Sequence, residues 1–275
     1  MSTLRITHVE PRPALEIESF SAASGGGRTE RRPIPVLRAH VEGLPAALDG
    51  VYITSDLQGR ERADASPHDR RLTGLAVAEA LAQHAEHVGL PHPDRAGVVL
   101  AGDLFAYADL RRRGGLGDVQ EVWRAFGERF RWVVGVAGNH DTFEGRADTA
   151  DALEGVARCE VFDGSWGERD GLRLGGVSGV IGAAGKPWRR DPPTFERLCR
   201  ALPSTLDVLV FHQGPDVPRE DRPGHELARQ VLRAHHLTAP LVICGHVHWR
   251  EPLATLPHGQ QVLNVDSRVI ALVRA

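Results

Sequence analysis

The sequence has few of the features that mark secreted or membrane-bound proteins. Its three cysteines, Cys159, Cys199 and Cys244, are too few and too scattered for a disulfide framework, which favours a reduced, intracellular setting. No stretch approaches the ~20 apolar residues that a membrane-spanning helix needs. The N-terminus also lacks the apolar core of a secretion signal. We therefore expect a cytoplasmic protein with no membrane partner.

An excess of charge of one sign is also absent. The net charge at pH 7 is −3 over 275 residues, so no overall electrostatic attraction draws the chain to nucleic acid or to acidic lipid. This balance argues against nucleic acid as a partner. The apolar fraction of 41% is sufficient for a large domain with a well-buried core.

The first 48 residues differ from the rest of the chain. Residues 4–9, 14–20 and 34–41 alternate apolar and polar side chains and predict strands, and the glycine-rich residues 21–28 predict a loop. Because this segment is too small for a core of its own, we expect an N-terminal β extension, residues 1–48, packed on a main domain of residues 49–275.

From Gly50 onward, apolar strand patterns alternate with helical ones. Asp118 is in position to cap a helix that ends at Phe130. The tail predicts three antiparallel strands at residues 252–256, 261–265 and 269–273. This order of elements indicates a layered α/β domain. The other predicted helices are 73–88, 191–202 and 226–234, and the other predicted strands are 51–54, 98–101, 132–137, 158–162, 172–177, 208–211 and 241–244.

Five polar clusters each follow a short apolar run. In open α/β sheets, ligand sites gather at the carboxyl ends of the strands. Carboxylates, amide oxygens and imidazoles suit Mn, Fe, Zn, Ni or Co better than the metals that prefer thiolates. Each cluster alone is compatible with an ordinary turn, but together they predict a metal centre. They are Ser55-Asp56-Leu57-Gln58-Gly59, Gly102-Asp103-Leu104-Phe105, Gly138-Asn139-His140-Asp141, Phe211-His212-Gln213-Gly214-Pro215 and Gly245-His246-Val247-His248.

The order of these clusters resembles that of the calcineurin-like metallophosphoesterase superfamily, from about Val51 to the C-terminus. The resemblance implies an α/β (α+β) fold, a four-layer β-sandwich of two mixed sheets flanked by helices. It also implies a dinuclear centre of two divalent metal ions, where a metal-bound hydroxide attacks a phosphate ester.

The resemblance also implies a role for individual side chains. His140 matches the catalytic histidine of the family, which protonates the leaving oxygen or stabilises the transition state. The remaining positions match metal ligands: Asp56 and His248 for the first ion, Asp103 as the bridge between the ions, and Asn139, His212 and His246 for the second ion.

The first cluster departs from the family pattern, because Gln58 stands where a histidine is usual. An amide oxygen is a weaker ligand than imidazole for zinc-like ions, so the first site is expected to be weaker or to select a harder ion, with Mn favoured. Gln58 either contacts the ion or hydrogen-bonds a water that the ion holds.

The second cluster lacks the Asp-Arg-Gly of protein Ser/Thr phosphatases and has Leu104-Phe105-Ala106-Tyr107 there instead. Both the phosphate-clamping arginine and the aspartate that orients the catalytic histidine are therefore missing. Asp141 and Tyr107 are the candidates for orienting His140. The substitution argues against a protein phosphatase.

Three residues are candidates for contact with substrate, namely Asn139, Arg112 and His225. Arg112 belongs to the run Arg111-Arg112-Arg113, which follows the second cluster, although such charge runs usually face solvent. His225 closely follows the His212 loop and could edge the pocket.

The resulting hypothesis is a metal-dependent phosphoesterase that acts on a phosphodiester or a small phosphomonoester, including nucleotides. One alternative is a non-catalytic interaction scaffold. Such relatives typically lose the catalytic histidine, and His140 is present here. The other alternative is a nuclease, which usually adds a further domain or a basic groove.

Overall fold

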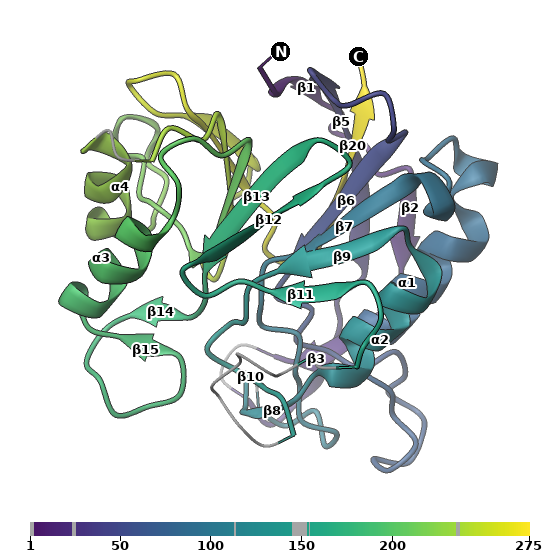
Figure 1. The fold of residues 1–275 in the computed structure, drawn as a ribbon. Helices are drawn as coiled ribbons and strands as arrows, with labels where there is room; N and C mark the ends of the chain where they lie inside the picture. Colours follow the sequence, from purple (N-terminus) through teal and green to yellow (C-terminus); the bar gives the residue numbers. More distant parts are fainter. Residues whose placement is uncertain (1–2, 24–25, 113, 145–152, 154, 235–236) are drawn as a thin grey trace.

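A computed structural model describes residues 3–23, 26–112, 114–144, 153, 155–234 and 237–275 (Figure 1). It is a mixed α/β structure with two large β-sheets and few helices. None of the helices that it describes is long and apolar enough to cross a membrane.

The first sheet has eight strands in the order β1-β5-β20-β6-β7-β9-β11, with β2 paired to β5. Strands β6, β7, β9 and β11 run parallel, so their carboxyl ends lie at the same edge. The bounds are β1 Arg5–Val9, β2 Leu15–Ile17, β5 Ile34–Glu42, β6 Gly50–Ser55, β7 Ala96–Leu100, β9 Trp132–Gly135, β11 Cys159–Val161 and β20 Arg268–Arg274.

The second sheet has six strands in the order β12-β13-β16-β17-β19-β18. Strands β13, β16, β17 and β19 are parallel, and β12 and β18 are antiparallel to their neighbours at the two edges. The bounds are β12 Ser165–Arg169, β13 Leu172–Val177, β16 Val208–Gln213, β17 Leu241–Gly245, β18 Leu253–Thr255 and β19 Gln261–Asn264.

Four α-helices and three short β pairs complete the described structure, together with single 3₁₀ turns at Glu86–Val88, Pro93–Arg95 and Pro218–Glu220. The helices are α1 Thr73–His84, α2 Gln120–Arg129, α3 Pro192–Ala201 and α4 Glu226–Arg233. The pairs are β3 Phe20–Ala22 with β4 Thr29–Arg31, β8 Gly117–Asp118 with β10 Asp141–Thr142, and β14 Val180–Ile181 with β15 Arg189–Arg190.

Three apolar cores follow from the alternation of side chains along the strands. In β7, Val98 and Leu100 enter the core beneath α1 and α2, whereas Val99 and Ala101 enter the core between the two sheets. A third core lies between the second sheet and the helices α3 and α4. In Figure 1 the two helix pairs lie on opposite sides of the molecule, with the sheets between them.

Most predicted elements are confirmed, and three need correction. The helix that begins at Thr73 ends at His84, and Gly89 (φ 67°) follows a separate 3₁₀ turn. Asp118 is not the cap of the next helix, which begins at Gln120 after Val119; its carboxylate accepts the Gln120 and Glu144 N–H groups instead. The last predicted strand does not pair with its predecessor.

That last strand, β20, lies in the other sheet, where it runs parallel to β5 and antiparallel to β6. The sequence pattern identified a strand but could not identify its partner, because pairing depends on where distant segments meet. β5 lies between β1 and β20, so residues 5–42 contribute strands to the sheet that also carries β6 and β7.

A chain that begins at Asp49 is predicted not to fold cooperatively. Removing β5 exposes the long edge of β20 and removes Val36, Ala39 and Val41, all fully buried, from two cores. Each fully buried valine contributes roughly 1.5–3 kcal/mol, against a total stability of about 5–15 kcal/mol. Thermal unfolding followed by circular dichroism checks this. A cooperative transition within a few degrees of that of the full chain contradicts it.

Candidate metal centre

The polar clusters follow strands whose ends meet at one edge of the two sheets. Asp56 follows β6 and Asp103 lies just after β7, while His246 follows β17 in the second sheet. These three residues adopt left-handed backbone conformations, with φ of 55°, 56° and 67°. Such conformations are uncommon for residues other than glycine and cluster at functional sites. Each one turns the chain sharply at the strand end.

Two glycines permit the loops to approach closely. A Cβ atom on Gly138 would lie 2.0 Å from Asp103 Oδ1, and one on Gly245 would lie 2.3 Å from Asp56 Oδ2. Any side chain at either position would displace a carboxylate. The glycines before Asn139 and His246 are therefore required by the packing of the centre.

One group of possible metal ligands converges on a single point within the described residues. It consists of Asp103, His212 and His246. Their ligand atoms all lie within 4.8 Å of one another. Asp103 and His212 are buried, and His246 is half-buried. Carboxylate and imidazole in this number and spacing fit a divalent transition-metal ion.

One buried atom beside this group, Asn139 Oδ1, has no hydrogen-bond partner among the described residues, and His212 Nε2 has only the Asp103 carboxylate, 3.3 Å away. Buried polar atoms are nearly always paired, so each orphan requires an explanation. The Asn139 oxygen carries lone pairs that a cation would accept, and His212 Nε2 carries one when its imidazole is neutral. The residues present therefore fit a metal ion at this point.

The two histidines differ in their electrostatics. His212 Nδ1 lies 2.7 Å from the Ala101 carbonyl and donates to it, which leaves Nε2 facing Asp103 Oδ2 at 3.3 Å. Burial lowers the pKa of His212, but the carboxylates of Asp103 and Asp56 outweigh burial and raise it to about 10. When no cation is bound, a proton on His212 therefore compensates the charge of these carboxylates. Burial and the neighbouring His212 lower the pKa of His246 to about 4.

Asp103 connects three of the predicted site residues. Its Oδ1 accepts the backbone N–H of His140 at 2.9 Å, and its Oδ2 accepts the Gln58 amide N–H at 2.9 Å. His212 approaches the same Oδ2. The structure thus places Gln58 against the expected bridging carboxylate, with its amide N–H and not its oxygen facing Asp103.

Asp56, Gln58 and His248 lie together around a cavity of about 320 Å³. Asp56 is buried, and its Oδ2 accepts the Ser55 hydroxyl and, at 2.8 Å, the His246 N–H. Burial and the nearby Asp266 carboxylate raise the pKa of Asp56 well above its usual value. Two neighbouring buried carboxylates repel each other when both are ionised, and a cation relieves that repulsion.

Asp266 also lines this cavity, and the sequence analysis missed it. Its Oδ1 lies 3.2 Å from His248 Nδ1, and Arg268 Nη2 lies 3.1 Å from His248 Nε2. The signal was present, because Asp266 follows the apolar end of β19 just as the other clusters follow their strands. His248 is 57% exposed and is held by these two residues at the rim.

His140 is oriented by backbone atoms of Gly115 and by neither predicted candidate. Its Nδ1 lies 2.9 Å from the Gly115 carbonyl and 3.1 Å from the Gly115 N–H. Tyr107 acts indirectly, since its ring packs so closely on Gly115 that a Cβ there would lie 2.4 Å from it. Nδ1 is thus occupied, and Nε2 lies 3.9 Å from Asp103 Oδ2.

Asp141 has a different structural role from the one considered. It is fully buried and accepts the backbone N–H groups of Asp103, Leu104 and Gly138, each at 2.8 Å. This carboxylate ties the loop after β7 to the loop after β9. It therefore fixes the relative position of Asp103 and Asn139.

The two other predicted substrate residues lie apart from these contacts. Arg112 is exposed, and Arg113 lies outside the described residues. His225 precedes α4 and caps it, because its Nδ1 accepts the Leu227 N–H at 3.1 Å. Neither Arg112 nor His225 lines the 320 Å³ cavity.

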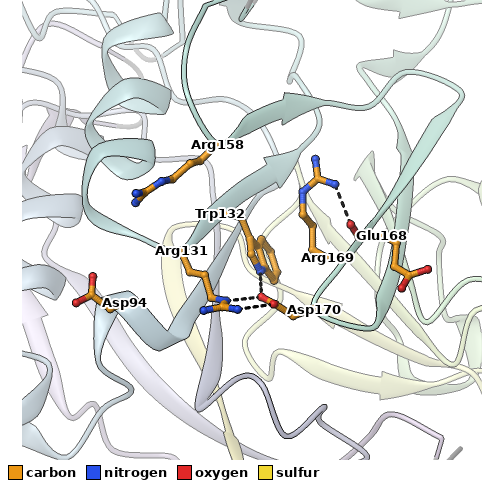
Figure 2. Close-up of a pocket in the computed structure, with 7 residues that line it drawn as sticks. All are labelled: Asp94, Arg131, Trp132, Arg158, Glu168, Arg169 and Asp170. Carbon is orange, nitrogen blue, oxygen red and sulfur yellow. Dashed lines mark hydrogen bonds and ion pairs between the residues drawn. The ribbon is translucent and has the colours of Figure 1, made fainter.

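A larger cavity, of about 570 Å³, lies near the start of β9, far from the strand ends that carry the clusters (Figure 2). Two of the arginines that line it are held in ion pairs. Arg131 makes a two-pronged ion pair with Asp170, which also accepts the Trp132 indole N–H. Arg169 pairs with Glu160. Size alone therefore does not identify the functional site.

The sequence model of one protein family, described as calcineurin-like phosphoesterase, matches residues 51–250. The chain belongs to the calcineurin-like phosphoesterase family. The match covers each of the five polar clusters. No curated protein matches the chain.

Solved structures resemble the chain at low sequence identity. One, for which no protein name is given, has 15% identity and a TM-score of 0.50, with 78% of this chain and 90% of that chain covered. The phosphopantetheinyl hydrolase PptH from Mycobacterium tuberculosis has 16% identity, a TM-score of 0.47 and coverage of 80% and 89%. A hypothetical protein from Thermus thermophilus has 17% identity, a TM-score of 0.44 and coverage of 78% and 75%.

Asp141→Asn is predicted to destabilise this phosphoesterase by about 1–3 kcal/mol, because the amide cannot accept all three N–H groups and leaves a buried donor unpaired. Burial raises the pKa of Asp141 to about 6, so urea unfolding should be measured at pH 8, where the carboxylate is ionised. Asp64→Asn, at an exposed ion pair, is the control and should change stability by less than ~0.5 kcal/mol. If the two substitutions lower the free energy of unfolding equally, Asp141 does not have the structural role described above.

Proposed function

We propose that this chain hydrolyses phosphate esters at a centre of two divalent metal ions. The observation that carries the proposal is the convergence of Asp103, His212 and His246 beside Asn139 Oδ1, a buried atom with no hydrogen-bond partner among the described residues. A purely structural cluster would have no reason to leave that oxygen unpaired in the interior. Membership of the calcineurin-like phosphoesterase family supports the same chemistry.

The two ions would have different ligand sets. Asn139, His212 and His246 would hold the second ion, and Asp103 would lie between the ions. Asp56, Gln58 and His248 would hold the first, with Asp266 adding a carboxylate nearby. Oxygen donors dominate the first set, which favours a hard ion such as Mn. When bound, the two ions would supply charge stabilisation for the phosphoryl oxygens and a water activated at neutral pH.

The residues of the chain supply positioning and proton transfer. With Nδ1 of His140 donating to the Gly115 carbonyl, the imidazolium is stabilised and Nε2–H is available to the leaving oxygen. Asp103 holds the His140 backbone, so the histidine is tied to the same carboxylate that would contact the ions. The four-layer arrangement of the family would place these loops at one end of the paired sheets.

The proposed substrate is a phosphodiester or a small phosphomonoester, including nucleotides. Leu104 to Tyr107 replace the clamp that protein phosphatases use, and the net charge of −3 gives no overall attraction to nucleic acid. The cavity of about 320 Å³ beside Asp56 and His248 suits a small ester.

The test is turnover of bis-p-nitrophenyl phosphate and p-nitrophenyl phosphate by the metal-free protein to which Mn, Zn or Ni is returned. Turnover is expected with at least one ion, and with Mn above the others. Activity should disappear with a chelator and return with the ion. The absence of turnover with every ion would sink the proposed function.

His140→Ala serves as the matched variant in this assay and separates an enzyme from an interaction scaffold. Loss of a general acid should lower kcat by ~10²-fold or more while the metal content per chain stays unchanged. A variant as active as the wild type would show that His140 does not assist the leaving group.

Gln58→His is predicted to increase the metal content per chain after dialysis against limiting Mn, because imidazole is a stronger ligand than an amide. Elemental analysis of the wild type and the variant measures this. Gln83→His, on the exposed face of α1, is the control and should leave the content unchanged. A wild type that already retains two ions, with no change on substitution, refutes a weak first site.

A further inference from the structure

The N-terminal residues Ser19 and Phe20 are attached to the loop that follows β6. Phe20 and Arg60 exchange two backbone hydrogen bonds, each of 2.8 Å, and the Ser19 hydroxyl lies 2.7 Å from that of Thr73. A Cβ atom on Gly59 would lie 2.4 Å from Ser19 Oγ, so the two segments touch there. The loop that carries Asp56 and Gln58 is therefore held by residues far upstream.

Residues 19–21 and 32–34 form one wall of the 320 Å³ cavity. Asp56, Gln58, His248 and Asp266 line the cavity on the side of the metal centre. The family match begins at residue 51, so the opposite wall lies outside the matched region. That wall consists of Ser19, Ser21, Arg32, Pro33 and Ile34.

Ser21 lines this cavity and carries a hydroxyl that makes no hydrogen bond within the described residues. The residue is 7% exposed, and its Oγ is buried. Burying a hydroxyl without a partner is unfavourable. A ligand in the cavity that accepts a hydrogen bond would remove this penalty.

Arg32 supplies the positive charge of this wall. Glu30 binds its Nε, and within the described residues its two terminal nitrogens make no hydrogen bond or ion pair. A guanidinium fixed at Nε presents its remaining N–H groups in a plane that matches two oxygens of a phosphate. The neighbouring Arg31 pairs with Glu18 and does not line the cavity.

We propose that residues 19–21 and 32–34 form the substrate-binding wall of the site, where Arg32 and the Ser21 hydroxyl bind the phosphate group of the ester. The inference rests on the proposed function and deepens it. The clamp that is absent after Asp103 is provided from the N-terminal segment. The substrate is thereby a small phosphate ester whose phosphate lies between the metal-ligand loops and this wall.

Binding of inorganic phosphate to the Mn-loaded full chain, measured by calorimetry, tests the role of Arg32. Arg32→Ala should weaken binding by roughly 10- to 100-fold, the range for a hydrogen bond to a charged group. The KM for p-nitrophenyl phosphate should rise with it, and kcat should change less than KM. Arg32→Lys keeps the charge but lacks the planar guanidinium. Its phosphate affinity should lie between those of the wild type and Arg32→Ala.

Arg31→Ala is the matched control, and its phosphate affinity should equal that of the wild type. Metal content per chain is measured for each variant and should stay constant. The proposal is overturned if Arg32→Ala binds phosphate as tightly as the wild type does. It is also overturned if Arg31→Ala loses as much phosphate affinity as Arg32→Ala. So does a loss of metal from Arg32→Ala and Arg32→Lys alike, because the effect would then lie in the metal centre.

Ser21→Ala distinguishes a binding role from a structural one. The hydroxyl makes no hydrogen bond within the described residues, so its removal should leave Tm unchanged or raise it, while phosphate affinity falls by roughly 2- to 10-fold. A lower Tm with unchanged affinity contradicts the proposal. The wild type could bind phosphate through Arg32 and yet show no turnover with any metal. That result would reject the proposed function but would support the anion-binding wall.

Discussion

The buried carboxylate of Asp103 is the interaction on which the rest of the site depends. It lies at the end of β7, almost fully buried, and contacts the His140 backbone, the Gln58 amide and the His212 ring. A lone charge in this position would be strongly unfavourable. Its neighbours compensate only in part, which explains why a proton on His212, or a cation in its place, belongs to the centre.

The surrounding loops are built to hold that charge in position. Asp141 ties the loops after β7 and β9 together through three backbone hydrogen bonds. Left-handed turns at Asp56, Asp103 and His246 direct these side chains inward from two sheets. Packing of the two sheets around a common core sets the distance between the loops, so the strained turns persist because the scaffold is rigid.

The N-terminal strands connect stability to function. β5 pairs with β20 in the first sheet, and residues 19–21 and 32–34 lie at the cavity beside Asp56 and His248. The same segment therefore supports the sheet that carries the first and second clusters and lines the space beside them. The Asp-Arg-Gly motif is absent after the second cluster, and a positive charge reaches the cavity from a distant part of the sequence.

The sequence by itself determined the family, the mixed α/β class and most elements, because apolar periodicity and short motifs are local properties. The motif order also identified Asp103, His212 and His246, which converge in the structure. Only the tertiary structure decided the place of β20, the contact of Gly115 with His140, the position of Asp266 beside Asp56 and the closeness of Arg32 to the cavity. Each of these joins segments that are distant along the chain or uses backbone atoms, which residue type does not encode.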